Sequence, residues 1–226
     1  MVAATRERES ELEALCVDAP ADPNGRWNAK DHLAHLTAWR NRGAELLDAV
    51  RTGGVPPEKA DEDDAENAKI YAATRDKSAE QIKREARASW ERLAASIEAY
   101  SEADLMKPHP HSPGNAIWEN VPGIAGHLGT HLMWWYLETS DPAAAEAVQL
   151  WARDVEHAAT SNPKERAITT YNLACLYSRI GKIEKSLPLL RESFDGNPGL
   201  REWAGKDPDL DAIRANPEFR ELVAAR

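Results

Sequence analysis

Two histidines four residues apart, His127 and His131, are the first candidates for chemistry in this sequence. In a helix, residues with this spacing project from one face about a turn apart, which suits two ligands of one metal ion. A third ligand must come from another helix. His35, near Leu33 and Trp39, is the natural candidate. Three neutral imidazoles would hold Zn²⁺, Ni²⁺ or Fe²⁺ and leave a position open for water or substrate.

The histidines also have purely structural interpretations, because pairs with this spacing often serve packing or lie on the surface. His32 precedes His35 by three residues and either replaces it as a ligand or faces solvent. His109 and His111 fall in a proline-rich loop, where they either rim a pocket or have no role. His157 is expected to be exposed.

Tryptophans and glycines are concentrated in the same part of the chain. Gly123, Gly126 and Gly129 recur at every third residue, and each costs about 1 kcal/mol relative to alanine in a helix. Their clustering predicts close helix approach or room for a ligand. Six of the eight tryptophans precede residue 141: Trp27, Trp39, Trp90, Trp118, Trp134 and Trp135. They predict either a tryptophan-rich core or a pocket for a flat or apolar small molecule.

The elements that must position these residues are all helices, since no alternation of apolar and polar residues is long enough to require a strand. Asn28 and Ser78 are expected N-caps, and Pro122 suits a first helical turn. Four main helices joined by loops, two of them long, indicate a four-helix bundle with a crossover. The expected helices of this part cover about residues 6–17, 28–51, 62–74, 78–100 and 121–139.

A second part is expected to begin at Asp141-Pro142, which predicts domains over 1–141 and 142–226. One helix is predicted over 143–159, followed by a helical hairpin over 165–180 and 182–195 that breaks at Gly181. Short helices follow at about residues 200–204, 208–215 and 217–224.

The charge distribution argues against nucleic acid as a partner. The chain has 226 residues and a formal charge of −10, of which −9 falls in residues 1–141. A phosphate backbone requires a basic surface instead. The acidic run from Asp61 to Asp64 lacks the spacing of a calcium loop and is expected to be a solvated loop or helix start.

The N-terminus is charged and shows no secretory signal. No segment approaches the roughly 20 apolar residues that a membrane span requires. We therefore expect a cytoplasmic protein, without membrane contact, in which Cys16 and Cys175 are free thiols.

Two histidine-containing segments resemble the DinB superfamily of four-helix bundles over about residues 5–140. They are Trp27–Trp39 (WNAKDHLAHLTAW) and His127–His131 (HLGTH). Within the superfamily the sequence is most similar to the ClbS/DfsB branch, for which Glu66–Tyr71 (ENAKIY) is the best marker, followed by Ser78–Leu93 and Ser101–Leu105.

The superfamily resemblance implies a central pocket in which His35, His127 and His131 bind a divalent metal. Its known members include metal-dependent thiol transferases and isomerases. The ClbS/DfsB branch implies self-protection against a reactive natural product, ClbS itself acting on an electrophilic cyclopropane warhead. Metal dependence is not general in that branch.

The second part resembles the tetratricopeptide repeat over about residues 167–200, in Tyr171-Asn172-Leu173-Ala174, Tyr177, Gly181, Ser186 and Pro198. Fewer than three repeats rarely stand alone. These helices are therefore expected to pack on the bundle, cap it, or form a homodimer contact.

The leading functional hypothesis is a ClbS/DfsB-like protein that inactivates or sequesters an electrophilic small molecule, by hydrolytic opening with an activated water. Glu66 and Tyr71 are the candidate catalytic residues, although both would also suit an ordinary helix surface. The candidate substrate contacts are Trp39, Asn67, Trp118 and Trp134.

Two alternatives stay open. One is a metal-dependent thiol transferase, in which the ion binds and deprotonates a small thiol. The other is a non-enzymatic module whose repeat helices recruit a peptide. Phosphate loops, CxxC pairs and nucleophile elbows are missing from the sequence.

Overall fold

The chain folds into helices joined by turns and loops. The computed structural model describes residues 1–20, 22, 24–57, 63–109, 116–120 and 123–225. No strand is present within these residues, which confirms the predicted all-α class. The chain divides into two compact units, Val2–Ile124 and Ala125–Arg226, and residue 1 groups with the second. This division concerns packing, and the expected domain boundary after residue 141 stays a prediction.

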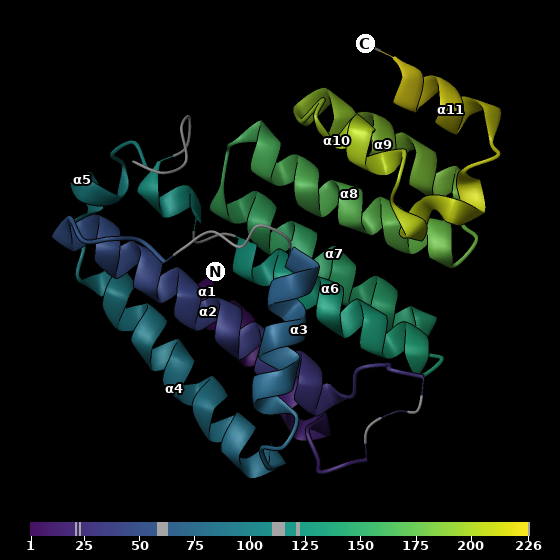
Figure 1. Cartoon of the computed structure of the whole chain (residues 1–226). Coiled ribbons are helices and arrows are strands. Elements are labelled where there is room, and N and C mark those ends of the chain that lie inside the picture. The colour runs from purple at the N-terminus through teal and green to yellow at the C-terminus, as the bar shows by residue number, and fades with distance from the viewer. Residues whose placement is uncertain (21, 23, 58–62, 110–115, 121–122, 226) are drawn as a thin grey trace. The chain divides into compact units, whose positions relative to one another are not determined.

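The first unit is organised around one long helix, α2, which packs chiefly against α4 (Figure 1). The predicted helices are confirmed with ends displaced by a few residues, whereas α5 and η1 were not predicted. The elements are α1 (Val2–Leu15), α2 (Ala29–Thr52), α3 (Asp63–Thr74), α4 (Ala79–Glu98), α5 (Glu102–Leu105) and the 3₁₀ helix η1 (Ile117–Asn120).

Side-chain caps explain where α2 and α4 begin. The Asn28 side chain accepts from the Asp31 amide, and the Asp31 carboxylate accepts from the Asn28 amide, so two otherwise unpaired N–H groups are satisfied reciprocally. Ser78 caps α4 by accepting from Gln81. Both predicted N-caps are confirmed. Because Asn28 fixes the start of α2, it also fixes the direction in which His35 projects, two turns further on.

A buried ion pair joins α1, α2 and α4. Arg40 of α2 pairs with Glu9 of α1, and each side chain is 4% exposed. The Trp90 indole of α4 donates to Glu9 at 2.8 Å, and the Arg40 guanidinium lies 3.7 Å from the centre of the Trp90 ring. Arg40 also donates to the Ser89 hydroxyl at 2.7 Å. A buried charge requires hydrogen-bonded or charged partners, and these contacts supply them for most polar atoms of the pair.

The second unit contains the C-terminal helices and α6 from Ala125 onward. The predicted helices are again confirmed, and the short helix expected at about residues 208–215 is a 3₁₀ helix over Pro208–Ile213. The elements are α6 (Gly123–Glu138), α7 (Pro142–Ala159), α8 (Pro163–Arg179), α9 (Ile183–Gly196), α10 (Leu200–Ala204), the 3₁₀ helix η2 (Pro208–Ile213) and α11 (Pro217–Ala224).

The glycines of α6 permit close contact with α7. A Cβ atom at Gly129 would lie 2.6 Å from the Ala152 Cβ, and one at Gly126 would lie 3.3 Å from a Glu156 carboxylate oxygen. These distances leave no room for a side chain at Gly129 and little at Gly126. Of the two interpretations of the glycine pattern, close helix approach is therefore confirmed at both positions.

The hairpin formed by α8 and α9 supplies the core of the second unit, and these two helices lie side by side in Figure 1. Gly181 makes the turn with a φ of +74°, a conformation that favours glycine. The Ser186 hydroxyl donates to the Ala174 carbonyl at 2.9 Å across the hairpin. The predicted break at Gly181 is confirmed. The core residues include Tyr171, Cys175, Leu187, Leu190, Phe194, Leu210 and Phe219.

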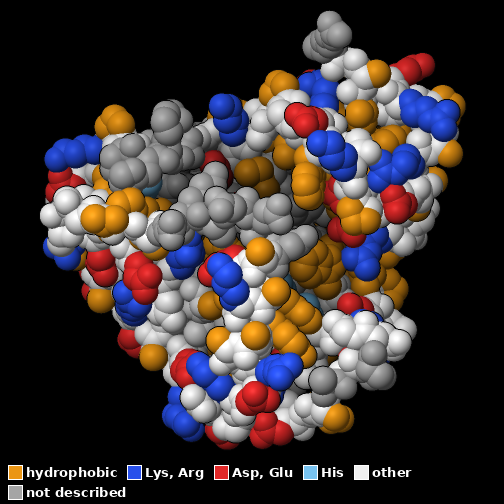
Figure 2. Space-filling view, viewed as in Figure 1, with side chains coloured by type: hydrophobic (Ala, Val, Ile, Leu, Met, Phe, Trp, Pro, Cys, Tyr) orange, Lys and Arg blue, Asp and Glu red, His pale blue; other side chains and the backbone are white. Residues whose placement is uncertain are grey.

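Several further predictions concern the surface and the thiols. Both cysteines are free, as predicted, and both are buried. None of the helices in the described ranges has the length and apolar character needed to cross a bilayer. Figure 2 shows acidic and basic side chains interspersed on the face in view. Asp61, Glu62, His111 and Pro122 lie outside the described residues.

Candidate metal centre

The paired histidines of α6 meet at their ring nitrogens. The Nε2 atoms of His127 and His131 lie 3.1 Å apart, and the two rings are 4.8 Å apart at their centres. His131 is 3% exposed, whereas His127 is half-buried. The ring of Trp134, one turn further along, meets the His131 ring edge-on at 5.2 Å. The four-residue spacing therefore brings two possible ligand atoms together on one face of α6, as the sequence predicted.

The separation of these nitrogens fits a shared ion. Two imidazoles bound tetrahedrally to Zn²⁺ at the usual distance would hold their ligating nitrogens about 3.3 Å apart. The observed distance between Nε2 of His127 and Nε2 of His131 is 3.1 Å, so little rearrangement is needed. The donor chemistry suits Zn²⁺, Ni²⁺ and Fe²⁺ alike.

His35, the predicted third ligand, lies in the first unit within an aromatic cluster. Its ring centre is 5.1 Å from that of Trp27 and 6.1 Å from that of Trp39. The side chain is buried, and burial lowers the pKa of His35 to about 4. The imidazole is therefore neutral at pH 7, which is the form that binds a metal.

Two residues of α3 complete this aromatic cluster. The Trp39 indole donates to the Asn67 side-chain oxygen at 3.2 Å. Tyr71 stacks on Trp27, with ring centres 6.4 Å apart and planes within 6° of parallel. The structure thus brings Trp39, Asn67 and Tyr71 together around the helix face that carries His35.

The other predicted site residues take more ordinary positions. Glu66 is half-buried on α3, and its carboxylate pairs with Lys69 at 3.2 Å. Trp118 is half-buried in η1, and Trp134 is half-buried on α6 beside His131. Their roles in catalysis or substrate contact stay predictions.

The remaining histidines exclude one alternative, for His32, and correct one expectation, for His157. His32 is 3% exposed and lies 5.5 Å from Trp27 between ring centres, so it does not face solvent. His157 is half-buried rather than exposed, because its ring contacts the Arg166 carbonyl at 3.1 Å and the Thr170 hydroxyl at 3.3 Å. His109 is buried, at 3% exposure.

Two residues near the histidines were not assigned a role from the sequence. Trp27 contacts His35 and Tyr71, and its signal was its place at the start of the WNAKDHLAHLTAW segment. Glu156 of α7 accepts from the Gly126 amide of α6 at 2.7 Å. Burial raises the pKa of Glu156 to about 7. Glu156 lies 30 residues from Gly126 in the sequence, so no local pattern could have predicted this contact.

Comparison with curated proteins found a match over a short segment of the chain. A 61-residue stretch is 30% identical to a chloroplastic protein of Arabidopsis thaliana, and it covers 27% of this chain and 18% of that protein. No solved structure matches the chain significantly.

The family comparison covers more of the chain. The model of the DinB superfamily matches residues 5–134, more than half of the sequence, and this range includes His35, His127 and His131. The chain belongs to the DinB superfamily.

Proposed function

We propose that this protein is a metal-dependent transferase that joins a low-molecular-weight thiol to an electrophilic small molecule. His35, His127 and His131 would hold the divalent ion. The observation that carries the proposal is the convergence of the His127 and His131 Nε2 atoms at 3.1 Å. Membership of the DinB superfamily, which includes metal-dependent thiol transferases, supports the assignment.

The histidines of this chain are suited to hold the ion at neutral pH. A metal ligand must be unprotonated, and the pKa of about 4 keeps His35 neutral. When bound, a divalent ion would lower the pKa of a thiol or water and so supply a nucleophile at neutral pH. That His35 meets the α6 pair around one ion is part of this proposal.

Aromatic side chains would receive the electrophile. Trp27, Trp39 and Tyr71 present ring faces and edges beside His35, and such surfaces bind flat or apolar groups while excluding water. Asn67 holds the Trp39 indole in place. Trp118 and Trp134 are proposed as further substrate contacts.

The reaction joins the thiol sulfur to an electrophilic carbon and breaks the bond from that carbon to its leaving group, which takes up the proton that the thiol loses. In a strained ring the leaving group stays attached to the product through the rest of the ring. The test is the consumption of a model epoxide or activated cyclopropane by metal-loaded protein, with and without a small thiol such as cysteine. Adduct formation that needs the thiol and is lost in His131→Ala would support thiol transfer. Unchanged activity in that variant would contradict it.

A second candidate is ClbS/DfsB-like hydrolytic inactivation without a thiol. It is favoured by the α3 segment that resembles this branch, because Asn67 and Tyr71 contact the tryptophans beside His35. Glu66 or Tyr71 would then move the proton of the attacking water. The same assay separates the two candidates: hydrolysed product in the absence of thiol, lost in Tyr71→Phe, would favour the second.

A further inference from the structure

The second unit contains a cavity that shares Trp134 with the proposed metal centre, while the metal-centre proposal uses none of its other lining residues. It has a volume of about 250 Å³ and lies among α6, α8, α10 and the segment that begins η2. This volume is slightly below the range of pockets that bind drug-sized ligands, so it suits a small metabolite. The residues that matter for its chemistry are Trp134, Tyr171, Cys175, Trp203, Asp207 and Asp209.

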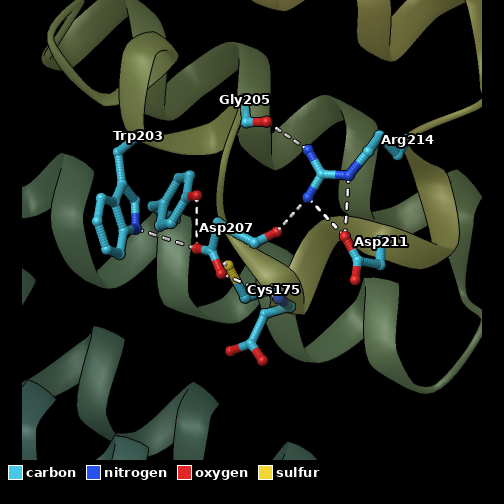
Figure 3. Close-up of polar contacts among 8 residues, drawn as sticks. Cys175, Trp203, Gly205, Asp207, Asp211 and Arg214 are labelled. Atoms are coloured by element: carbon cyan, nitrogen blue, oxygen red, sulfur yellow. Dashed lines mark hydrogen bonds and ion pairs between the residues drawn. The ribbon is translucent and has the colours of Figure 1, made fainter.

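A carboxylate forms the polar wall of this cavity. Asp207 is 7% exposed, and its Oδ2 atom accepts from the Tyr171 hydroxyl at 2.7 Å and from the Trp203 indole at 3.1 Å (Figure 3). The Cys175 thiol also donates to Oδ2 at 3.7 Å. Oδ1 accepts from the Asp209 amide at 2.9 Å, as an N-cap of η2. These four donors are all neutral.

The nearby arginines are engaged elsewhere. Arg214 donates to the Asp207 carbonyl at 2.7 Å and pairs with the Asp211 carboxylate at 2.6 Å, and it also contacts the Gly205 carbonyl (Figure 3). It therefore fixes the backbone around Asp207 without meeting its carboxylate in these contacts. Arg179 pairs with Asp209 at 3.3 Å.

An ionised carboxylate held by neutral donors keeps its full negative charge, and removing that charge from water is costly unless a cation compensates it. The rings of Trp134, Tyr171 and Trp203 line the same cavity. Aromatic faces attract cations, and aromatic cages bind quaternary ammonium groups. We infer that this cavity binds a small organic cation, with an ammonium head directed to Asp207 and an apolar body against the aromatic rings.

The position of Trp203 gives such a ligand access from solvent. Trp203 lines the cavity yet is 58% exposed, and Ile168, which also lines it, is 41% exposed. The hydrogen bond from the indole to Asp207 holds the exposed ring in place. The ring is therefore ordered before a ligand arrives, which reduces the entropy lost on binding.

A metal ion is a weaker candidate for the same place. Ligand atoms of Cys175, Asp207 and Asp209 lie within 4.8 Å of one another, a spacing that a metal ion would also fit. However, metals bind the thiolate, whereas Cys175 is a thiol that donates a hydrogen bond to Asp207. Burial raises the pKa of Cys175 and so favours the thiol. Asp209 is already paired with Arg179. Binding of an organic cation requires neither deprotonation of Cys175 nor loss of the ion pair between Arg179 and Asp209.

The test compares choline with its neutral isostere 3,3-dimethyl-1-butanol on the full-length chain, by calorimetry in the presence of a metal chelator. We expect choline to bind at least about tenfold more tightly, because only the cation gains from the charge and the ring faces. Equal affinity of the two probes would overturn the inference. So would the absence of any heat of choline binding at the highest concentration titrated. A separate titration without chelator would also overturn the inference if Zn²⁺ bound tightly to wild type and this binding were lost in Cys175→Ser.

Two variants assign the binding to this cavity. Asp207→Asn removes the charge but retains an N-cap side chain, and we expect it to weaken choline binding about tenfold or more. Trp203→Leu alters an exposed side chain and is expected to weaken choline binding severalfold in a folded protein. Glu218→Gln is the matched control, since this carboxylate pairs with Arg191 at the surface and is not among the cavity residues. Choline affinity unchanged in both test variants would overturn the assignment.

Because the chelator removes metal, this result does not depend on the histidine centre. Failure of choline to bind would leave thiol transfer untouched, and failure of thiol transfer would leave the cation site untouched.

Discussion

Gly129 of α6 occupies a position at which even a methyl group does not fit. A Cβ there would lie 2.6 Å from the Ala152 Cβ, and neither atom can move without its helix. We predict that Gly129→Ala lowers the free energy of unfolding by about 1–3 kcal/mol, despite the better helix propensity of alanine. Urea denaturation would measure the change.

Gly43 of α2 provides the control for this substitution. A Cβ at Gly43 would meet no atom within 4 Å, so Gly43→Ala is expected to raise the free energy of unfolding by up to about 1 kcal/mol. If both substitutions had the same effect on stability, the close approach of α6 and α7 would not be what requires glycine.

Glu156 is expected to make stability depend on pH. Burial is the largest cause that raises its pKa, from 4.5 to about 7, and the Glu165 charge adds to it, while the amides of Gly126 and Ala125 act in the opposite direction. The folded protein therefore binds this proton more tightly than the unfolded chain. The resulting stabilisation is fully present below pH 4.5 and is lost as the pH rises through about 7.

Replacing this group removes its titration. We predict that wild type loses up to about 3 kcal/mol more stability than Glu156→Gln between pH 4.5 and pH 8. Denaturation midpoints measured across this range would show a steeper decline for wild type. Parallel pH profiles for the two proteins would contradict the shifted pKa of Glu156.

Among the elements, the helices with strong local signals were the most predictable. Asn28 and Ser78 are capping residues, and both helices begin immediately after them, as the sequence predicted. The short elements α5 and η1 were missed, because four residues contain too little periodicity to detect. Residues 208–213 were correctly located, but their 3₁₀ geometry was not predicted.

The buried ion pair that joins α1 to α2 should be far more sensitive than a surface pair. Arg40→Met would leave the Glu9 carboxylate buried without its cation, and we predict a loss of about 3–5 kcal/mol in the free energy of unfolding. Arg92→Met is the matched control, since its pairing with Glu45 is exposed and should contribute no more than about 1 kcal/mol. Similar losses in chemical denaturation would contradict this account of the pair.

At the scale of the whole molecule, spacing alone pointed to two of the three ligands of the proposed metal centre. The interval between His127 and His131 is a property of one helix, so their convergence followed from local geometry. Trp39 lies one turn from His35 on α2, so that contact is also local. The stacking of Tyr71 on Trp27 depends on how α3 meets α2, which no local pattern encodes.

The cavity of the second unit could not have been predicted from the sequence either. Asp207 meets Tyr171 across 36 residues, and the contact arises only because η2 packs against α8. Tyr171 and Cys175 were interpreted from the sequence as a repeat residue and a free thiol. Only the folded arrangement shows that both donate to one buried carboxylate.

The central claim is that His35, His127 and His131 hold a divalent ion together. The most direct measurement is an equilibrium titration of metal-free protein with Zn²⁺ and with Ni²⁺, for wild type and for His35→Ala, His131→Ala and His157→Ala. The account predicts a single tight site per chain, weakened at least about 100-fold in the first two variants and unchanged in His157→Ala, which lies on α7. A wild-type protein that binds neither ion, or a site that persists unchanged in His35→Ala, would contradict it.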